Sequence, residues 1–315
     1  MARPYRLDEE DCFYHITSRG DDRKPIFKSE RDYARFLEYV SVAKDKFKFY
    51  LHAYCLMTNH YHLFIETTQA NLSRIMQYIN TSYAVYYNVK RKRSGHLFQG
   101  RFKSIIVQQD AYYAELTRYI HLNPVRAGMR DEPGKYRWSS YNDFVKNKPE
   151  SGVDIDRVKM YLGMDLRRYA GFVKAAGNEY PNPLKNVYAG FILGKAQFIK
   201  DKLSRLGNDI KTRDFAHKRA LKNMVAPEEI IKTVANHFNT NPEDIRNTRK
   251  KNMTAKKAAI YLLRCKTGLT NSQIGELFGM QSSAVSMAAR GFEKKLESAK
   301  DLKRGIEGVS LKFDV

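Results

Sequence analysis

Cysteine is scarce in this sequence, with three residues among 315. Cys12, Cys55 and Cys265 lie far apart, their number is odd, and no Cys-x-x-C pair occurs. The sequence therefore indicates neither a disulfide framework nor a zinc knuckle. Cys12 and Cys55 each lie in an apolar run, so we expect buried free thiols and a reducing compartment, the cytoplasm.

Long apolar runs are absent as well. No stretch approaches the roughly 18 apolar residues that a membrane-spanning helix needs, and no signal peptide follows Met1. We therefore expect no membrane partner. A Walker motif for nucleotide binding is also missing, which argues against a built-in helicase or ATPase.

Acidic residues are outnumbered, because 34 Asp and Glu stand against 56 Lys and Arg, a formal net charge of +22. Such a surplus favours a polyanionic partner, although a ribosome-like or merely well-solvated basic surface has the same composition. The length is sufficient for two or three domains with cores of their own.

Two histidines stand side by side near the middle of an apolar segment, LHAYCLMTNHYHLFIET at 51–67. The segment is typical of two strands joined by a tight turn at Thr58-Asn59. Because side chains alternate along a strand, His60 and His62 point to the same face. Paired imidazoles suit a metal ion, but a bare His-x-His is more often surface or packing chemistry.

A second stretch, RYIHLNPVRAG at 118–128, raises the odds of a metal site. Tyr119 and Asn123 are spaced four residues apart and share one face if the segment is helical. An amide oxygen and two imidazoles can hold a divalent ion that polarises a phosphodiester, and a tyrosine can attack the phosphorus. Pro124 disfavours helix at Asn123, so the helix is predicted to end or kink there.

The first half of the chain reads as strand, helix, two strands, helix, strand, helix. Apolar stripes at helical spacing follow Ser29, Asn71 and Asp110, and we expect these residues to act as N-caps. The order is typical of an α+β, ferredoxin-like antiparallel sheet with its helices on one side. Two features stay open: His15 reaches the site or only packs, and the basic run 90–93 is a solvated helix end or a DNA-backbone contact.

Four motifs occur in order: YHITSRG at 14–20, NHYH at 59–62, GHLFQGRFK at 95–103 and RYIHLNPVRAG at 118–128. Together they resemble the REP-associated tyrosine transposases, which belong to the HUH single-strand-DNA transposases with one catalytic tyrosine. The resemblance covers residues 1–148. Thr58 departs from it, because the family usually has proline before the Asn-His.

The resemblance implies an HUH domain of the same fold, acting as a metal-dependent single-strand DNA endonuclease and strand transferase at hairpins. Tyr119 would attack the phosphate and leave a 5′-phosphotyrosine. His60, His62 and Asn123 would hold Mg²⁺ or Mn²⁺, whose preferences suit oxygen and imidazole ligands. The side chains expected to contact the DNA backbone are Arg19, Arg101, Lys103 and Arg126.

The rest of the chain is predicted to be helical. Residues 149–222 should form a connector with helices near 155–162 and 189–206. Residues 223–315 should form a separate domain with helices at 230–239, 255–266, 270–278 and 282–296. In this domain Thr270 and Gln273 form a capping-box pair, Gly279 makes a turn, and Ser282 caps the last helix. Helix, short turn with Gly, helix is the helix-turn-helix pattern.

The segments IIKTVANHF at 230–238 and LTNSQIGELFG at 269–279 resemble the duplex-binding domain of the bacterial replication initiator DnaA. Where that family has Asp-His-Ser/Thr, this chain has QSSA at 281–284. The resemblance therefore implies duplex DNA binding, through Ser282, Ser283 and Arg290, but not the initiator's recognition sequence. A helical bundle without DNA is the alternative, and the basic residues argue against it: Lys250, Lys251, Lys256, Lys257 and Arg290.

The expected partners are thus single-stranded DNA hairpins and, through the C-terminal domain, duplex DNA. A monomer and a homodimer are both compatible with the sequence. Two other functions stay open. One is a DNA-binding regulator without catalysis, and the other is RNA hairpin binding, because the same type of sheet also binds RNA.

Overall fold

The computed structural model describes residues 3–4, 7–148, 151–177, 182–212, 215–216, 226–247, 253–267 and 269–313. The chain forms two compact units. The sheet unit comprises Tyr5–Val187 and Phe191–Ile199, and the helical unit comprises Met1–Pro4, Tyr188–Gly190 and Lys200–Val315. The sheet unit thus extends well beyond residue 148, the limit predicted for the first domain.

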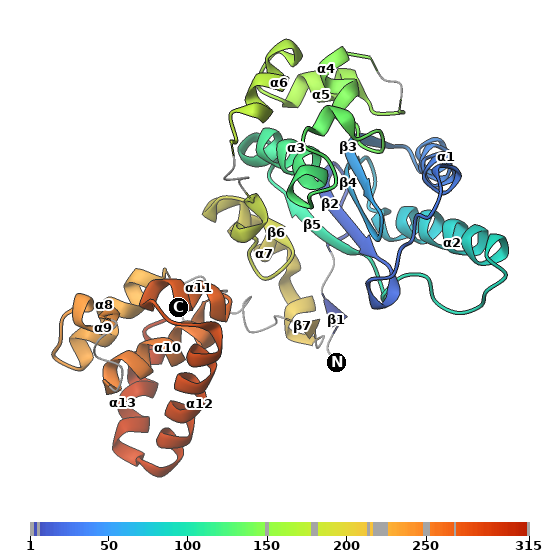
Figure 1. Ribbon diagram of the computed structural model, residues 1–315. Coiled ribbons are helices and arrows are strands. Elements are labelled where there is room, and N and C mark those ends of the chain that lie inside the picture. Colours follow the sequence, from blue (N-terminus) through green and yellow to red (C-terminus); the bar gives the residue numbers. More distant parts are fainter. Residues whose placement is uncertain are drawn as a thin grey trace. The chain divides into compact units, whose positions relative to one another are not determined.

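A five-stranded sheet forms the centre of the sheet unit (Figure 1), with strand order β3-β4-β2-β5-β6. The strands β3, β4, β2 and β5 pair antiparallel with their neighbours. Together with three helices they follow the predicted order along the chain, which confirms the α+β, ferredoxin-like arrangement. The fifth strand pairs parallel with β5, so the sheet is mixed, where a purely antiparallel sheet was expected. These elements are β2 (Cys12–Arg19), α1 (Glu30–Phe47), β3 (Phe49–Met57), β4 (His60–Thr67), α2 (Leu72–Lys90), β5 (Lys103–Val107), α3 (Gln109–Arg126) and β6 (Ile192–Leu193).

Helices cover both faces of the sheet, so the expectation of helices on one side is wrong. On β4, the ring of Tyr61 lies 4.7 Å from Phe36 of α1, while the ring of His62 lies 6.0 Å from Tyr119 of α3. α1 and α2 therefore cover one face and α3 the other (Figure 1). The reason is that β4 is buried on both faces after its first residue, and a strand of that kind needs a cover on each side.

The segment after α3 continues to pack on the sheet. The backbone N–H of Tyr54 on β3 donates to Ser140 Oγ (2.9 Å), and Asp154 Oδ2 accepts from the backbone N–H of Leu51 (2.6 Å). The predicted all-helical connector over 149–222 is wrong at β6 and at β7 (Phe215–Ala216), which pairs parallel with β1 (Arg3–Pro4). The remaining elements are η1 (Asp21–Arg23), η2 (Pro133–Lys135), α4 (Tyr141–Lys146), α5 (Ile155–Tyr161), α6 (Leu166–Lys174), η3 (Pro183–Asn186) and α7 (Ala196–Thr212).

The helical unit has a core of its own, built from the apolar stripes of its helices. The predicted capping box of Thr270 and Gln273 is confirmed, and Gly279 ends the same helix in the left-handed region, at φ 59°. The cap of α12 is different from the prediction, because Gln281 holds the N-cap position and Ser282 lies inside the helix. The helices are α8 (Pro227–His237), α9 (Pro242–Arg246), α10 (Thr254–Lys266), α11 (Asn271–Phe278), α12 (Ser282–Ser298) and α13 (Lys300–Leu311), of which α9 and α13 were not expected.

Across the described ranges, no helix combines the length and the apolar composition needed to cross a membrane.

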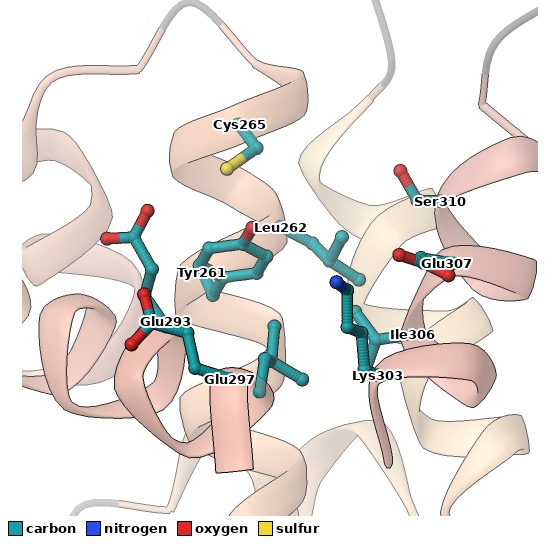
Figure 2. Close-up of a pocket in the computed structure, with 10 residues that line it drawn as sticks. Tyr261, Leu262, Cys265, Glu293, Glu297, Lys303, Ile306, Glu307 and Ser310 are labelled. Carbon is teal, nitrogen blue, oxygen red and sulfur yellow. The ribbon is translucent and has the colours of Figure 1, made fainter. Parts of the chain in front are cut away.

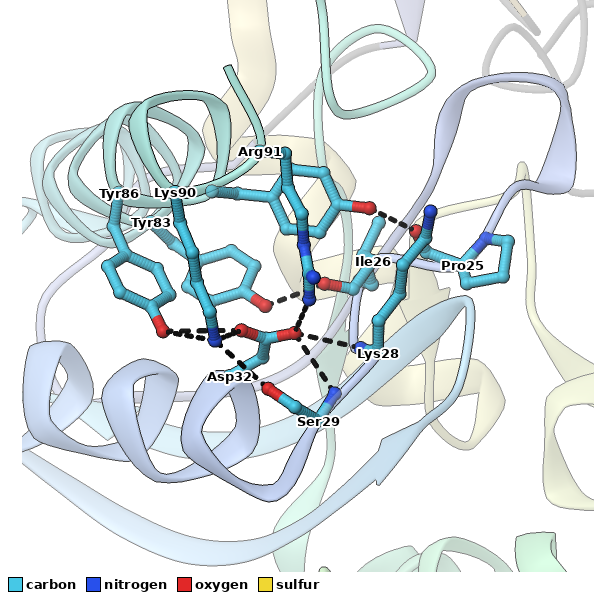
Figure 3. A network of polar contacts seen from close by, with 10 residues as sticks. Pro25, Ile26, Lys28, Ser29, Asp32, Tyr83, Tyr86, Lys90 and Arg91 are labelled. Atoms are coloured by element: carbon cyan, nitrogen blue, oxygen red, sulfur yellow. Dashed lines mark hydrogen bonds and ion pairs between the residues drawn. The ribbon is translucent and has the colours of Figure 1, made fainter. Parts of the chain in front are cut away.

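A buried carboxylate joins the start of α1 to the end of α2 (Figure 3). The Asp32 side chain is fully buried and accepts hydrogen bonds from the backbone N–H groups of Lys28 (2.9 Å) and Ser29 (3.1 Å). Lys90 (2.5 Å) and Arg91 (2.6 Å) supply the compensating charges. Burial alone would raise the pKa of Asp32, but the hydrogen bond from Lys90 and the further donors lower it to about 2.

Two residues of the basic run 90–93 therefore have an internal partner, which favours the helix-end interpretation over a DNA contact for Lys90 and Arg91.

We expect Asp32→Asn to lower the free energy of unfolding of the sheet unit by about 3 kcal/mol. Removing one partner of a buried pair costs roughly 3–5 kcal/mol, and we place this case at the low end because Lys90 and Arg91 are 26% and 28% exposed. Urea unfolding followed by the fluorescence of Trp138 measures it, because this residue is the only tryptophan and stacks on Tyr33 in the sheet unit.

Asp45→Asn is the matched control, because Asp45 is exposed on the same helix. It should change the free energy of unfolding by less than about 0.5 kcal/mol. An equal loss in both variants would contradict the stabilising role of Asp32.

Candidate active site

A basic pocket opens where β2 ends and β4 begins, on the face of the sheet that α3 covers. Its cavity volume is about 550 Å³. The lining residues come from the first half of the chain and from η3: Thr17, Ser18, Arg19, Arg23, Asn59, His60, His62, Gln99, Arg101, Lys103, Tyr119 and Leu184.

Most of the residues predicted for the first domain meet in this pocket: Arg19, His60, His62, Arg101, Lys103 and Tyr119. Asn123 and Arg126 lie on the same helix as Tyr119 but outside the lining. Sequence reasoning missed Asn59 and Gln99, although both stand within quoted motifs. It had no signal for Leu184, which belongs to the connector in which no chemistry was found.

Three motifs are joined by backbone bonds at the rim of the pocket. The N–H of Gly20 donates to Asn59 O (2.8 Å), and the N–H of Gln99 donates to Arg19 O (2.9 Å). A Cβ at position 20 would lie 2.1 Å from Lys24 O and would clash with the backbone there, so this position requires glycine. The side chain of Arg19 also donates to Gln99 Oε1 (2.5 Å), which orients one guanidinium at the rim.

Asn59 fixes the tautomer of His60. The Asn59 Nδ2 atom donates to Arg23 O (3.0 Å), so its Oδ1 faces His60 Nδ1 at 2.7 Å. A carboxamide oxygen can only accept, and therefore Nδ1 of His60 carries the proton. The lone pair of His60 then lies on Nε2, the atom available to a metal ion.

His62 is deeper and has a second histidine behind it. His62 Nδ1 lies 2.9 Å from His15 Nε2, and the two rings stack with centroids 5.2 Å apart. His62 Nε2 and His15 Nδ1 are both buried without a hydrogen-bond partner among the described residues. His15, whose position was left open by the sequence, thus reaches the site through His62.

The donor set fits a divalent cation. Burial, together with the charge of Arg19, lowers the pKa of His60. Burial and neighbouring positive groups, Arg126 among them, lower the pKa of His62. Both rings are therefore neutral at pH 7, as metal ligands must be. Within the described residues no group of three or more His, Cys, Asp or Glu could hold a metal, so an ion here would also need amide, water or phosphate oxygens.

Tyr119 stands beside the two histidines. Its ring centroid lies 6.0 Å from that of His62 and 6.2 Å from that of His15, at near-perpendicular angles. The guanidinium of Arg126 lies 4.8 Å from the centre of the Tyr119 ring. No hydrogen bond of the Tyr119 hydroxyl occurs in the part of the chain that the structure describes, so this group is free for a ligand.

Asn123 has a structural task in α3. Pro124 has no N–H, so the carbonyl of Ile120 loses its helical partner. The Asn123 Nδ2 atom instead donates to Ile120 O (3.4 Å) and to Tyr119 O (2.9 Å). The helix continues to Arg126, so of the two predicted alternatives, an end or a kink at Asn123, the end is wrong.

The start of α3 also differs from the prediction. Gln108 holds the N-cap position, and Asp110 lies in the first turn, where a negative charge favours the helix dipole.

Buried histidines hold α3 against the sheet. His52 on β3 bonds to the Tyr113 hydroxyl (2.7 Å) with one ring nitrogen and to Glu66 (3.1 Å) with the other. His121 bonds to Ser140 Oγ (2.8 Å) in the segment that docks on β3. These contacts fix the position of α3 and thereby of Tyr119.

A second candidate surface lies on the helical unit. Ser282, Ser283 and Arg290 are exposed on α12, as a DNA-contacting helix requires. Lys256 does not belong to this surface, because it is buried and its Nζ donates to Asn247 O (2.9 Å). Lys250 and Lys251 lie outside the described residues.

An acidic cavity lies beside the C-terminal part of α12. A cavity of about 230 Å³ has an apolar base that includes Leu262 and Ile306 and an acidic rim (Figure 2). The carboxylates of Glu293, Glu297 and Glu307 line it, with Lys303 among them. The excess of carboxylates makes this cavity unsuited to phosphate.

Tyr119→Phe should leave the free energy of unfolding of the sheet unit within about 0.5 kcal/mol of the wild type, because its hydroxyl has no bond to lose. Tyr113→Phe on the same helix should cost about 1–3 kcal/mol, because it leaves the buried Nδ1 atom of His52 without its partner. Urea unfolding by Trp138 fluorescence compares them. Equal losses would mean that the Tyr119 hydroxyl is internally bonded.

Comparisons with known proteins match two separate parts of the chain. The family model "Transposase IS200 like" matches residues 8–123, and the model "Bacterial dnaA protein helix-turn-helix" matches residues 227–291. A solved structure described as a REP-associated tyrosine transposase bound to a REP hairpin covers 50% of this chain and 90% of that chain, at 16% identity and a TM-score of 0.41.

The curated relatives that match this chain are chromosomal replication initiator proteins, DnaA. The protein of Nautilia profundicola is 35% identical over 119 residues, which are 35% of this chain and 27% of that protein. The protein of Campylobacter jejuni is 29% identical over 100 residues, 31% of this chain and 23% of that protein. The chain thus spans about a quarter of the length of these relatives. Residues 8–123 are thus similar to IS200-like transposases, and residues 227–291 are similar to the DnaA helix-turn-helix.

Proposed function

We propose that the protein is a metal-dependent, single-strand DNA endonuclease and strand transferase of the HUH type that acts at the foot of DNA hairpins. The observation that carries the proposal is the meeting of Tyr119, His60 and His62 in one basic pocket. A hydroxyl without a hydrogen bond to the described residues, two neutral imidazoles and several cations are the groups that phosphodiester transfer needs.

The proposed cation is Mg²⁺ or Mn²⁺, held by the Nε2 atoms of His60 and His62. Asn123 is the proposed third ligand through Oδ1, because its Nδ2 is taken by the backbone. When bound, such an ion withdraws electrons from a phosphate oxygen and stabilises the charge that develops in the transition state.

Tyr119 is the proposed nucleophile. Its Oη forms a bond to phosphorus while the bond to the 3′ oxygen breaks, which gives a 5′-phosphotyrosine and a free 3′-OH. Because the phosphotyrosine retains the bond energy, a second 3′-OH can displace the tyrosine without ATP. Arg126, beside the ring, contributes positive charge to this position.

The basic rim is proposed to bind the DNA backbone through Arg19, Arg101 and Lys103, with Arg126 from α3. Several phosphate contacts of this kind make binding strongly dependent on salt. The proposed substrate is single-stranded DNA with a hairpin, because the four motifs resemble those of the REP-associated tyrosine transposases. We propose that the protein acts on DNA in the cytoplasm, as a monomer or a homodimer.

We expect Tyr119→Phe to abolish cleavage and to leave hairpin binding within about twofold. Labelled single-stranded hairpin oligonucleotides, incubated with Mn²⁺ or EDTA and run on a denaturing gel, should give a covalent adduct only with wild type and metal. Tyr112→Phe is the matched control on the same helix, because Tyr112 does not line the pocket.

An adduct that persists in Tyr119→Phe would remove Tyr119 as nucleophile. Tight hairpin binding without cleavage by the wild type would favour the regulator without catalysis, and stronger binding of a ribo-hairpin of the same sequence would favour RNA.

The helical unit is proposed to bind duplex DNA through the N-terminal half of α12, with Ser282, Ser283 and Arg290. What supports this is the exposure of these side chains and the match of residues 227–291 to the DnaA helix-turn-helix. The absence of Asp-His-Ser/Thr at 281–284 separates duplex binding from the initiator's own recognition sequence.

Arg290→Gln should weaken duplex binding by the full chain and reduce the salt slope of log K by about one, as the loss of one phosphate contact does. Arg304→Gln, an exposed substitution on α13, removes the same charge elsewhere and should leave the slope unchanged. Anisotropy titrations at several salt concentrations measure both. Equal slopes for Arg290→Gln and wild type would rule out a phosphate contact at Arg290.

A further inference from the structure

The two histidines among the proposed metal ligands each have a second residue on Nδ1. For His60 that residue is Asn59, whose carboxamide oxygen can only accept, so the tautomer is determined. For His62 it is His15, a ring that can either donate or accept at Nε2. The state of His62 therefore depends on how this histidine pair shares its proton.

We propose that His15 is a positioning residue, whose Nε2 accepts a hydrogen bond from His62 Nδ1–H and so keeps the lone pair of His62 on Nε2. This inference rests on the proposed function, because it concerns the ligand of the ion that the function needs. It assigns a role to His15, the histidine of the YHITSRG segment, which lies next to the pocket but does not line it.

Two tautomeric arrangements are available to the pair. If His15 donates, His62 Nε2 must carry a proton and cannot bind a cation. If His62 donates, its Nε2 has a lone pair, and the unpaired proton lies on His15 Nδ1. Both Nε2 of His62 and Nδ1 of His15 are buried without a partner, so hydrogen bonding by itself does not separate the two states.

Charge separates them. His62 lines the same pocket as the cations Arg19, Arg101 and Lys103, whereas its Nδ1 atom faces His15, which does not line the pocket. A lone pair on His62 Nε2 is attracted by such cations, whereas an N–H dipole at the same atom is repelled. Within the hydrogen-bonded pair, the basic pocket therefore favours the arrangement in which His62 donates, and His15 Nε2 supplies the acceptor that this arrangement needs.

Packing alone does not account for an imidazole at position 15. The side chain is 1% exposed, and residues 13, 15 and 17 share one face of β2. Phe13 is apolar, and Thr17 already lines the pocket, so His15 occupies the position between core and site. A buried polar nitrogen without a partner is unfavourable compared with an apolar side chain of similar size, so packing would be served better by leucine.

Two variants at position 15 distinguish the effect of the hydrogen-bond acceptor from the effect of the side-chain volume. His15→Gln retains an acceptor oxygen for His62 Nδ1–H, whereas His15→Leu fills the space without one. We expect ¹⁵N spectra of histidine-labelled, metal-free protein to give His62 protonated at Nδ1 in wild type and His15→Gln. In His15→Leu, His62 should be protonated at Nε2 to a large extent.

Calorimetry with Mn²⁺ supplies the second measurement. The affinity should fall 10- to 100-fold in His15→Leu, the usual effect of losing a group that orients a ligand, and should be largely restored in His15→Gln. Asn59→Leu is the matched control. It should change the His60 signals and leave the His62 tautomer as in wild type. Urea unfolding by Trp138 fluorescence verifies that each variant is folded.

Protonation of His62 at Nε2 in metal-free wild type would overturn the inference, and so would unchanged Mn²⁺ affinity in folded His15→Leu. Wild type that neither binds Mn²⁺ nor cleaves hairpins would overturn the proposed function instead. In that case the tautomer of the metal-free protein still decides the role of His15.

Discussion

The alternation of side chains along β4 is the constraint on which the sheet unit depends. Tyr61 points into the core between the sheet and α1, while His60 and His62 point to the face that α3 covers. A shift of one residue in register would exchange the two sets. The strand is held in place by full pairing with β2 and β3 and by burial from its second residue onward. The register of this buried strand thus determines the positions of His60 and His62 in the candidate site.

Several buried polar groups of the sheet unit have a partner that fixes their protonation state or orientation. Asp32 has two cations, His52 has a hydroxyl and a carboxylate, and His60 has a carboxamide whose direction is set by a backbone carbonyl. Among the buried histidines of the described residues, His15 and His62 differ, because each has one ring nitrogen without a hydrogen-bond partner. Buried polar atoms without a partner are unfavourable and rare, and they concentrate where a ligand completes the bonding. Here they lie directly behind the pocket.

The two units differ in how they use the net charge of +22. In the sheet unit, Lys90 and Arg91 neutralise a buried carboxylate, while Arg19 stands at the rim of the pocket. In the helical unit, one end of α12 exposes serines and arginine and the other borders an acidic cavity. Basic composition therefore predicts a polyanionic partner, but only local geometry says which cations are free to meet it.

By itself, the sequence determined what depends on neighbours along the chain. Its periodicity predicted the order of strands and helices, the shared face of His60 and His62, and the capping box of Thr270 and Gln273, because these follow from dihedral preferences and short-range bonds. Only the tertiary structure decided that α3 covers the second face and that β6 joins the sheet. It also decided that Leu184 lines the pocket and that His15 Nε2 lies 2.9 Å from His62 Nδ1. The bond from the amide of Asn123 to the backbone of its own helix was likewise visible only there. These contacts join residues that are distant in sequence or depend on what a helix meets. They are determined by the burial of both faces of the sheet, which no local pattern contains.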